Sequence, residues 1–362
     1  MPPNAHIFDL DPAALDVLTT QWGMPTYRSR QVLHAVYQRM VADPRQMTDL
    51  SQHDRAFLSG RLRILTGRAA EHQSASDGVQ KLLIDFSSAN GRLPVAGDAG
   101  NQIECVMIPT PKRRTACISS QIGCPVGCRF CASGIGGLDD NLTAGQIVEQ
   151  VWQLQRLTGS YPGLDRISHV VFMGMGEPLA NLENVVAAVR TLMADWAFGI
   201  SGRRITISTV GLPAQIRRLA DLGLPITLAI SLHAPDDELR RKLIPWADYV
   251  SIDQLVDAGR YYFDRTGREV TLEYILLHKV NDQPVHARRL VEVARRLRSN
   301  VNLIRYNEVK GLAYSRPASA DVHRFGQILK DAGVNTHIRA SRGRDIAAAC
   351  GQLRHDQATA VN

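Results

Sequence analysis

Three cysteines separated by three and two residues are the strongest chemical signal in the sequence. Cys124, Cys128 and Cys131 lie in the segment CPVGCRFC. Structural zinc prefers four protein ligands, and the sequence has no second CxxC and no HxxxH pair to complete such a site. A three-cysteine loop in which Gly123 and Gly127 permit tight wrapping is typical of a [4Fe–4S] cluster with one iron left open. We therefore predict an iron–sulfur cluster, with zinc or buried structural cysteines as the alternatives.

The other three cysteines lie outside this triad. Six cysteines in 362 residues, with no secretion signal, do not indicate a disulfide framework. Cys350 has small neighbours, and Arg342 and Arg344 would favour its thiolate if they lie close in space. Cys117 ends a predicted strand seven residues before the triad. A buried structural role is the alternative for both residues and the default for Cys105.

Alternating strands and helices are expected to position these residues from about residue 115 onward. Six such units indicate a parallel sheet with crossover helices. They are too few for a complete eight-stranded barrel, so the α/β pattern predicts a partial barrel or a doubly wound sheet. In both, the site lies at the carboxyl ends of the strands. The predicted strands are 116–119, 169–173, 204–208, 226–231, 270–276 and 302–306, and the predicted helices are 144–158, 182–193, 214–222, 252–265 and 284–299.

The first hundred residues have a different pattern. Apolar spacing predicts helices over 27–40 and 49–65. A strand over 80–86, a turn-rich connection over 87–102 and a partner strand over 103–108 predict a hairpin. This part is therefore expected to be a small helical domain that continues into a hairpin.

Composition sets the class of protein. The chain is 44% hydrophobic and 21% charged, as expected for a globular protein. Its longest apolar runs are about ten residues long, which is too short to span a membrane as a helix. The N-terminus does not resemble a secretory signal, so we expect a cytoplasmic protein. The charge balance, 42 − 35 = +7, permits an anionic partner such as RNA without requiring one.

Small or polar residues follow several predicted strands. The segment GMGEP at 174–178 comes directly after an apolar strand, and glycine there would let the backbone approach a ligand. Each of these residues alone is also typical of a turn or helix cap, but together they mark the catalytic edge of such a fold. The candidates are Gly176, Glu177, Ser208, Ser231, Leu232, His233 and Asn307.

Several segments, in the right order, resemble the RlmN/Cfr family of radical S-adenosylmethionine (SAM) enzymes, which methylate adenine in RNA. They are 114–124, 136–145, 171–178, 231–235 and 341–352, and the likeness extends over 104–353 and more weakly into the N-terminal region. The resemblance implies a partial (β/α)6 TIM-like barrel of the radical SAM type. It divides the chain into an N-terminal RNA-binding domain with hairpin (1–100), the barrel core (101–345) and a C-terminal tail (346–362).

The resemblance also implies roles for the candidate residues. Cys124, Cys128 and Cys131 would hold the cluster, and the seven residues at the strand ends would contact SAM. Two SAM molecules would be used per turnover. One would methylate Cys350, and the reduced cluster would cleave the second to a 5′-deoxyadenosyl radical that takes hydrogen from the S-methyl group.

The remaining steps would join protein and RNA transiently. The methylene radical on Cys350 would add to adenine, and Glu104 would serve as the general base. Attack by Cys117 on the Cys350 sulfur would then release methylated RNA and leave a disulfide. A charged, solvated hairpin residue is the alternative reading of Glu104.

The expected product is 2-methyladenine in 23S rRNA and in tRNA beside the anticodon. A Cfr-type enzyme that methylates carbon 8 of the ribosomal adenine is the first alternative, and a non-catalytic, zinc-stabilised RNA-binding protein is the second. Expected partners are these RNAs and a reductant such as flavodoxin or ferredoxin, with a monomeric enzyme and no membrane. RNA contacts are expected in the N-terminal domain, while the basic runs at 112–114, 288–289 and 295–296 are more typical of solvated faces.

Overall fold

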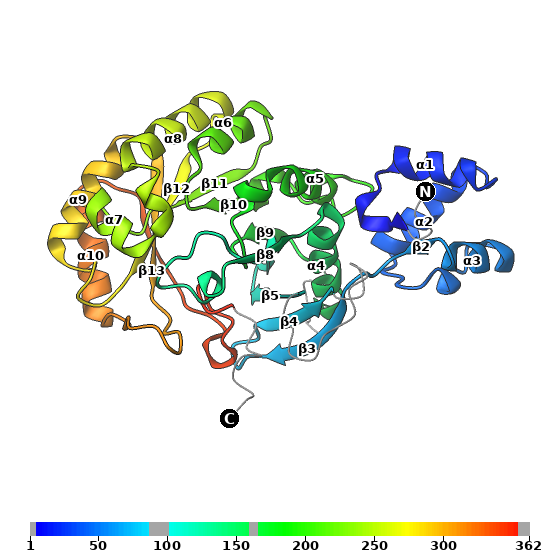
Figure 1. Cartoon of the computed structure of the whole chain (residues 1–362), viewed down its shortest axis with the longest axis horizontal. Coiled ribbons are helices and arrows are strands. Elements are labelled where there is room, and N and C mark those ends of the chain that lie inside the picture. Colours follow the sequence, from blue (N-terminus) through cyan, green and yellow to red (C-terminus); the bar gives the residue numbers. More distant parts are fainter. Residues whose placement is uncertain (1–4, 87–100, 159–165, 354–362) are drawn as a thin grey trace.

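A twisted ten-stranded sheet forms the centre of the protein. The computed structural model describes residues 5–86, 101–158 and 166–353. Seven neighbouring strands run parallel in chain order and curve into an open barrel (Figure 1). They are β6 (Arg113–Cys117), β9 (His169–Phe172), β10 (Ile205–Thr209), β11 (Thr227–Ser231), β12 (Val270–Leu276), β13 (Ser299–Arg305) and β14 (Thr336–Arg339).

Helices cover the outer face of this barrel. Each parallel strand from β6 to β13 is followed by at least one helix, which gives six βα units and then β14. The partial barrel predicted from the sequence is thereby confirmed. The helices are α4 (Ala144–Leu157), α5 (Leu182–Met193), α6 (Pro213–Asp221), α7 (Asp237–Leu243), α8 (Ile252–Thr266), α9 (Pro284–Arg295) and α10 (Ser319–Asp331).

Local sequence fixes where these elements begin and how deeply they lie. Thr143 and Gln146 form a capping box at the start of α4, and Ser251 and Gln254 form another at α8. Strand β12 is buried along its whole length because it lies between two other strands, with helices on its outer side.

Three elements of the barrel were not predicted. Strand β14 has the sequence THIR and alternates between buried and exposed residues at the sheet edge, so it lacks the apolar run of an inner strand. Helix α7 is short and charged. Helix α10 did carry a readable signal, because Val322, Phe325, Gly326 and Leu329 are buried at helical spacing.

The predicted hairpin extends the same sheet. Strands β3 (Arg68–Ser74), β4 (Gln80–Asp85) and β5 (Gln102–Thr110) are antiparallel, and β5 pairs with β6. The predicted domain boundary at residue 100 thus falls between two paired strands of one sheet. Most of the connection expected over 87–102 lies outside the described residues.

The N-terminal helices form a compact unit beside α4 (Figure 1). Helices α1 (Pro12–Gln21), α2 (Tyr27–Tyr37) and α3 (Gln52–Ser59) accompany a two-stranded parallel sheet of β1 (Ala5–His6) and β2 (Leu62–Arg63). Helix α3 is shorter than the predicted 49–65, since it ends at Gly60 and the chain then enters β2.

Side chains of α4 hold this unit against the barrel. The indole N–H of Trp152 donates to the Val36 carbonyl at 2.8 Å, and the Trp152 ring packs 5.9 Å from that of Phe8. A buried indole satisfied by a helix-end carbonyl fixes the contact in one geometry. Among the helices of the described residues, none has the length and apolar character required to cross a bilayer.

Candidate active site

The cysteine loop lies between β7 (Gln121–Gly123) and β8 (Leu138–Asn141). Cys124, Cys128 and Cys131 all line one cavity of about 140 Å³. Backbone hydrogen bonds shape the loop, from Cys124 N to Gly137 O at 2.7 Å and from Cys131 N to Cys128 O at 3.1 Å. Gly127 has φ 67°, a conformation that glycine adopts without strain.

The donor set bears on which metal group fits the loop. Burial raises the pKa of Cys124 to about 12 and raises that of Cys128 well above its usual value, so a bound metal is needed to form thiolates. Structural zinc sites are closed by four protein ligands. Three cysteines can hold three irons of a [4Fe–4S] cluster and leave the fourth iron open. The three-cysteine loop therefore fits such a cluster.

Strand ends from the barrel complete this cavity. Gly174, Gly176, Ser208, Ser231 and His233 line it together with the cysteines. Gly176 has φ 103°, and a Cβ there would lie 2.7 Å from the Ser120 hydroxyl, so a side chain is excluded. The Ser208 and Ser231 hydroxyls are 3.3 Å apart. Predicted SAM contacts from three strands thus meet the cysteine loop.

Glu177 lines the same cavity and is buried. Burial raises its pKa to about 7, although the Val210 N–H at 2.8 Å and the Leu179 N–H at 3.0 Å both donate to the carboxylate and oppose this shift. Glu177 therefore holds two backbone segments by hydrogen bonds, and a cationic ligand in the cavity would favour its ionised form.

His233 lines the cavity as a neutral imidazole. Burial lowers its pKa to about 3, and the nearby Arg240 acts in the same direction. Its Nδ1 accepts from the Ile275 N–H at 3.1 Å, which assigns the proton to Nε2. The residue is held at φ 58° and its ring meets the edge of Phe130 at 5.1 Å.

A second cavity of about 370 Å³ adjoins the first and contains both remaining predicted catalytic cysteines. Cys117, at the end of β6, and Cys350, in the C-terminal segment, line it together. Burial raises the pKa of Cys117 to about 12; the neighbouring Cys350 adds to the shift and Arg339 opposes it. The Cys350 thiol is therefore close enough to influence the charge of Cys117. Cys350 also lines the first cavity, so it stands between the two.

Cys350 itself is protonated in this environment. Much of its surface is accessible, and this surface opens on the two cavities. Desolvation, Glu273 and Cys131 raise its pKa to about 12, and Arg339 is the arginine that opposes the shift. The expected assistance from Arg342 and Arg344 is thus replaced by that of Arg339, on β14.

The segment that carries Cys350 is tied to the cysteine loop. The Ala132 N–H donates to Gly351 O at 2.8 Å, and the Ser133 hydroxyl donates to Leu353 O at 2.7 Å. The Asn307 amide donates to Cys350 O at 3.2 Å. Asn307, which is expected to contact SAM, lines the second cavity. These hydrogen bonds therefore hold the segment that carries Cys350 against the cysteine loop.

Two other predicted residues lie outside the walls of both cavities. Leu232 is buried, and its N–H donates to Glu273 O at 3.0 Å. Glu104 is buried and its carboxylate lies 2.8 Å from the Lys81 ammonium. It shares a sheet face with Cys117, because Val106 pairs with Cys117 and Glu104 is two residues along β5. Cys105 is fully buried, consistent with a structural role.

Glu273 is a site residue that sequence reasoning missed. It lies in the middle of β12, lines both cavities and accepts from the Asn302 amide at 2.9 Å. Burial raises its pKa. A single carboxylate within the apolar run VTLEYIL was the available signal, because buried strands of parallel sheets are otherwise apolar.

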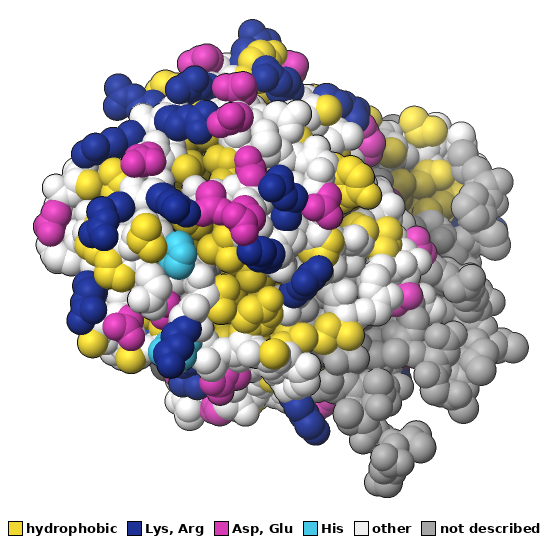
Figure 2. Space-filling view, turned by 60° about the vertical axis from the view of Figure 1, so that its left-hand side comes forward, with side chains coloured by type: hydrophobic (Ala, Val, Ile, Leu, Met, Phe, Trp, Pro, Cys, Tyr) yellow, Lys and Arg dark blue, Asp and Glu magenta, His cyan; other side chains and the backbone are white. Residues whose placement is uncertain are grey.

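The arginine runs of α9 face outward and engage acidic partners. Arg289 pairs with Asp236 at 2.9 Å and Arg296 pairs with Asp253 at 2.7 Å. Figure 2 shows basic and acidic side chains intermingled over this side of the barrel. The α9 run thus has the character of a solvated face. Arg113, from the 112–114 run, instead lines the second cavity beside Cys117.

Comparison with known proteins agrees with this geometry. Residues 118–291 match the model of the Radical SAM superfamily. A solved radical SAM methyltransferase from Sphaerobacter thermophilus is 39% identical, with a TM-score of 0.90 over 96% of this chain and 99% of that chain. The barrel, the cysteine loop and the glycine-rich strand end thus define a radical SAM enzyme.

Curated relatives narrow the class. A protein of Rhodopirellula baltica named probable dual-specificity RNA methyltransferase RlmN is 40% identical over 98% of this chain and 92% of its own length. A relative of the same name from Gloeobacter violaceus is 44% identical over 92% and 90%. Residues 5–64 match the model described as Ribosomal RNA large subunit methyltransferase N-terminal domain. The chain belongs to the RlmN family of radical SAM methyltransferases.

Proposed function

We propose that this enzyme methylates carbon 2 of adenine in 23S rRNA and in tRNA next to the anticodon. The observation that carries the proposal is the placement of Cys350 between a SAM-type cavity and a second cavity that also holds Cys117. A methyl group accepted at the first cavity can be presented to a base in the second. Carbon 2 of adenine is not nucleophilic, so direct displacement on SAM would not suffice.

The residues of the first cavity would hold the cofactors. Cys124, Cys128 and Cys131 would bind a [4Fe–4S] cluster, and Gly176, Glu177, Ser208, Ser231 and His233 would surround SAM. When bound, these groups supply a transferable methyl group and, after reduction by a flavodoxin- or ferredoxin-type donor, a carbon radical. Walls of buried side chains would keep water from that chemistry.

Cys350 would act as the methyl carrier. Its thiol must lose a proton before it accepts a methyl group, since the thiolate is the nucleophile. Once methylated and converted to a carbon radical, the sulfur-bound carbon would link protein to adenine. The surplus electron of this adduct would return to the oxidised cluster that the cysteine loop would hold. Asn307 and the cysteine loop would hold the backbone of this segment in place during both steps.

Cys117 would release the product. Its thiolate would attack the Cys350 sulfur and form a Cys117–Cys350 disulfide. The carbon–sulfur bond to the RNA would break, and its electron pair would return to the methylated base, which takes up a proton. Glu104, which shares the sheet face of Cys117 and pairs with Lys81, would accept the ring proton. An external reductant would restore both thiols.

RNA would enter at the second cavity. Arg113, Arg339 and Arg342 line it, and guanidinium groups bind phosphate well. The target base must leave its stack to reach Cys350, so we propose base flipping from a loop. The N-terminal domain would grip the RNA backbone, in keeping with the family model that matches it. Six free cysteines suit a reducing compartment such as the cytoplasm, and we propose that the enzyme acts there as a monomer.

Nucleoside mass spectrometry of rRNA and tRNA from a deletion strain tests this function. Loss of 2-methyladenine from both RNAs, with restoration by the plasmid-borne gene, is the expected result. Persistence of 2-methyladenine together with loss of 8-methyladenine would instead establish the Cfr-type alternative. Anaerobic reconstitution with iron and sulfide separates the enzyme from a zinc-stabilised RNA-binding protein, because the binding protein would give no brown cluster and no SAM cleavage.

A further inference from the structure

We propose that His278, Asp282 and Asp321 form a second metal site, which takes a zinc-type divalent cation. His278 and Asp282 lie on the loop between β12 and α9, and Asp321 lies in the first turn of α10. Across residues 5–86, 101–158 and 166–353, this is the group of three potential ligands whose binding atoms all lie within 4.8 Å of one another. The site is separate from the cysteine loop and goes beyond the proposed RNA methylation.

The Asp282 carboxylate carries a buried oxygen that has no hydrogen bond. Its side chain is 1% exposed. Oδ1 accepts from the Lys279 N–H at 3.0 Å and from the Gln283 amide at 2.8 Å, whereas Oδ2 has no hydrogen bond. A buried carboxylate oxygen that is left without a hydrogen bond destabilises the fold. Such an atom, close to two other side chains that can bind metal, points to a bound cation.

The His278 ring is placed to bind the same cation. Its Nδ1 is buried, has no hydrogen bond and lies 3.7 Å from Asp282 Oδ2, too far for a direct hydrogen bond. Two atoms bound to one zinc ion at about 2.0–2.2 Å can lie up to about 4.4 Å apart, so 3.7 Å suits a shared ion. The ring is 37% exposed, which gives a solvent ion access to the site.

The donor set selects the class of metal. Two carboxylates and one neutral imidazole carry a charge of −2, which a divalent cation balances. Sites made only of oxygen donors favour Mg²⁺ or Ca²⁺, and an imidazole shifts the preference toward Zn²⁺ and its neighbours. Three protein ligands leave a coordination position for water.

A metal ion at this site would stabilise the wall of the first cavity. Asn281, on the same loop, donates from its amide to His233 O at 2.8 Å and to Ile275 O at 2.6 Å. Its Oδ1 accepts from the Leu277 N–H at 2.7 Å. Coordination by Asp321 would tie this loop to α10, so the ion would position His233 through Asn281. The site is therefore assigned a positioning role, not a catalytic one.

Zinc binding to the reconstituted holoenzyme tests the proposal, because the cluster then occupies the three loop cysteines. Equilibrium dialysis against buffered Zn²⁺ with metal analysis would compare the wild type with His278→Ala and Asp282→Asn. His323→Ala is the matched control, since this exposed histidine lies on α10 two residues from Asp321. Zinc bound at other thiols is common to all four proteins and cancels.

We expect the wild type and His323→Ala to bind one more Zn²⁺ per chain than the two site variants, which should bind it at least tenfold more weakly. Zn²⁺ should also raise the melting temperature of the first pair only, and Mg²⁺ at the same concentration should not. Equal zinc stoichiometry and affinity in all four proteins would overturn the assignment. So would a preference of the wild type for Mg²⁺. Iron content and visible absorption verify that each variant is folded and loaded.

Discussion

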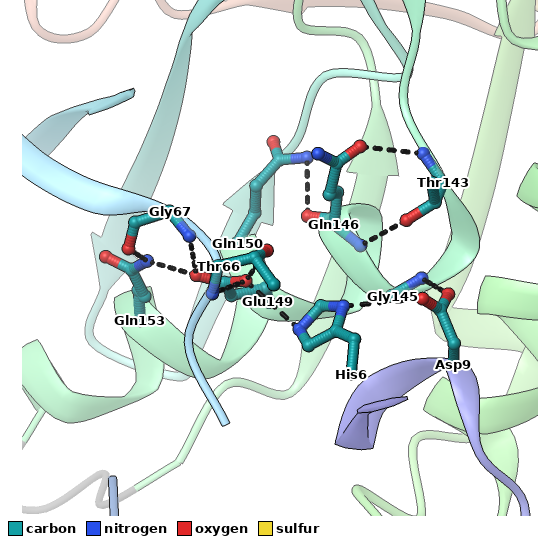
Figure 3. A network of polar contacts seen from close by, with 10 residues as sticks. All are labelled: His6, Asp9, Thr66, Gly67, Thr143, Gly145, Gln146, Glu149, Gln150 and Gln153. Carbon is teal, nitrogen blue, oxygen red and sulfur yellow. Dashed lines mark hydrogen bonds and ion pairs between the residues drawn. The ribbon is translucent and has the colours of Figure 1, made fainter. Parts of the chain in front are cut away.

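The imidazole Nε2 of His6 lies 3.2 Å from Oε2 of Glu149, which joins the first strand of the N-terminal domain to helix α4 of the barrel (Figure 3). Asp9 lies on the other side of the ring, 3.4 Å from Nδ1. The buried Glu149 carboxylate also accepts from the Thr66 N–H at 2.9 Å and the Gly67 N–H at 2.8 Å. One carboxylate thus gathers both ends of the N-terminal unit.

This ion pair predicts that stability falls in mildly alkaline solution. Burial alone would lower the pKa of His6, but Asp9 and Glu149 outweigh it and raise the pKa to about 9 from 6.5. The contribution is therefore complete below about pH 6.5 and is lost as the pH rises through 9. Its size is about 3 kcal/mol. Thermal unfolding between pH 6.5 and 9.5 should show this loss, and His6→Gln should largely abolish that pH dependence.

His53→Gln serves as the control for His6. His53 lies on α3 in the same N-terminal unit, and its side chain is 87% exposed. Its substitution should leave the alkaline transition unchanged. An unaltered pH dependence in His6→Gln would contradict the assigned role of the His6–Glu149 contact.

Replacement of Cys350 should separate cofactor binding from methyl transfer. Cys350→Ala removes the proposed carrier sulfur but leaves Cys124, Cys128 and Cys131 in place. We expect unchanged iron content, no methyl group on the protein by intact-mass measurement, and at least a thousandfold loss of 2-methyladenine formation. Appreciable turnover in this variant would refute the carrier role.

Replacement of Cys117 should stall the reaction at a later point. Among the described residues, Cys117 and Cys350 are the two cysteines that line the second cavity. No other cysteine there can therefore take the place of Cys117. Cys117→Ala is therefore expected to accumulate a covalent protein–RNA species, visible as a shifted band that survives denaturation and disappears after nuclease digestion. Cys105→Ala, at the buried neighbouring strand, is the matched control. Clean release of RNA by Cys117→Ala would count against a resolving thiol.

Arg240 should support both the fold and the cluster loop. It is fully buried, and its guanidinium donates to Leu232 O at 3.3 Å, Val250 O at 3.2 Å and Val210 O at 2.6 Å. Burial lowers its pKa to about 10 and the nearby Cys128 opposes this shift, so the cation persists at neutral pH. Arg240→Met would strand three carbonyls and should cost about 3 kcal/mol or more.

The same substitution should alter the redox properties of the loaded enzyme. Removal of a buried positive charge near Cys128 favours the oxidised cluster, so the reduction potential should become more negative in a titration followed by electron paramagnetic resonance. Arg241→Met, at the exposed neighbouring position, should change neither stability nor potential. An unchanged reduction potential in Arg240→Met would show that the arginine does not influence the cluster.

The sequence was informative where one residue type has one dominant use. Apolar strands followed by amphipathic helices predicted the barrel, and the cysteine spacing with the strand-end residues located the first cavity. Residues whose roles depend on distant partners were not predictable. Arg240 reads as one more charge on a short helix, and Arg339 lies on a strand without an apolar run. Their positions beside Cys128 and Cys117 arise only when the sheet closes around them.

The hydrogen bonds from Ala132 and Ser133 to Gly351 and Leu353 imply an order of assembly. The C-terminal segment that carries the proposed methyl-accepting sulfur rests on the turn that would hold the iron–sulfur cluster. A newly made polypeptide that has not yet acquired iron would hold neither feature firmly. Maturation of the metal centre should therefore precede the first self-modification of the protein, so that incompletely assembled chains do not consume methyl donor.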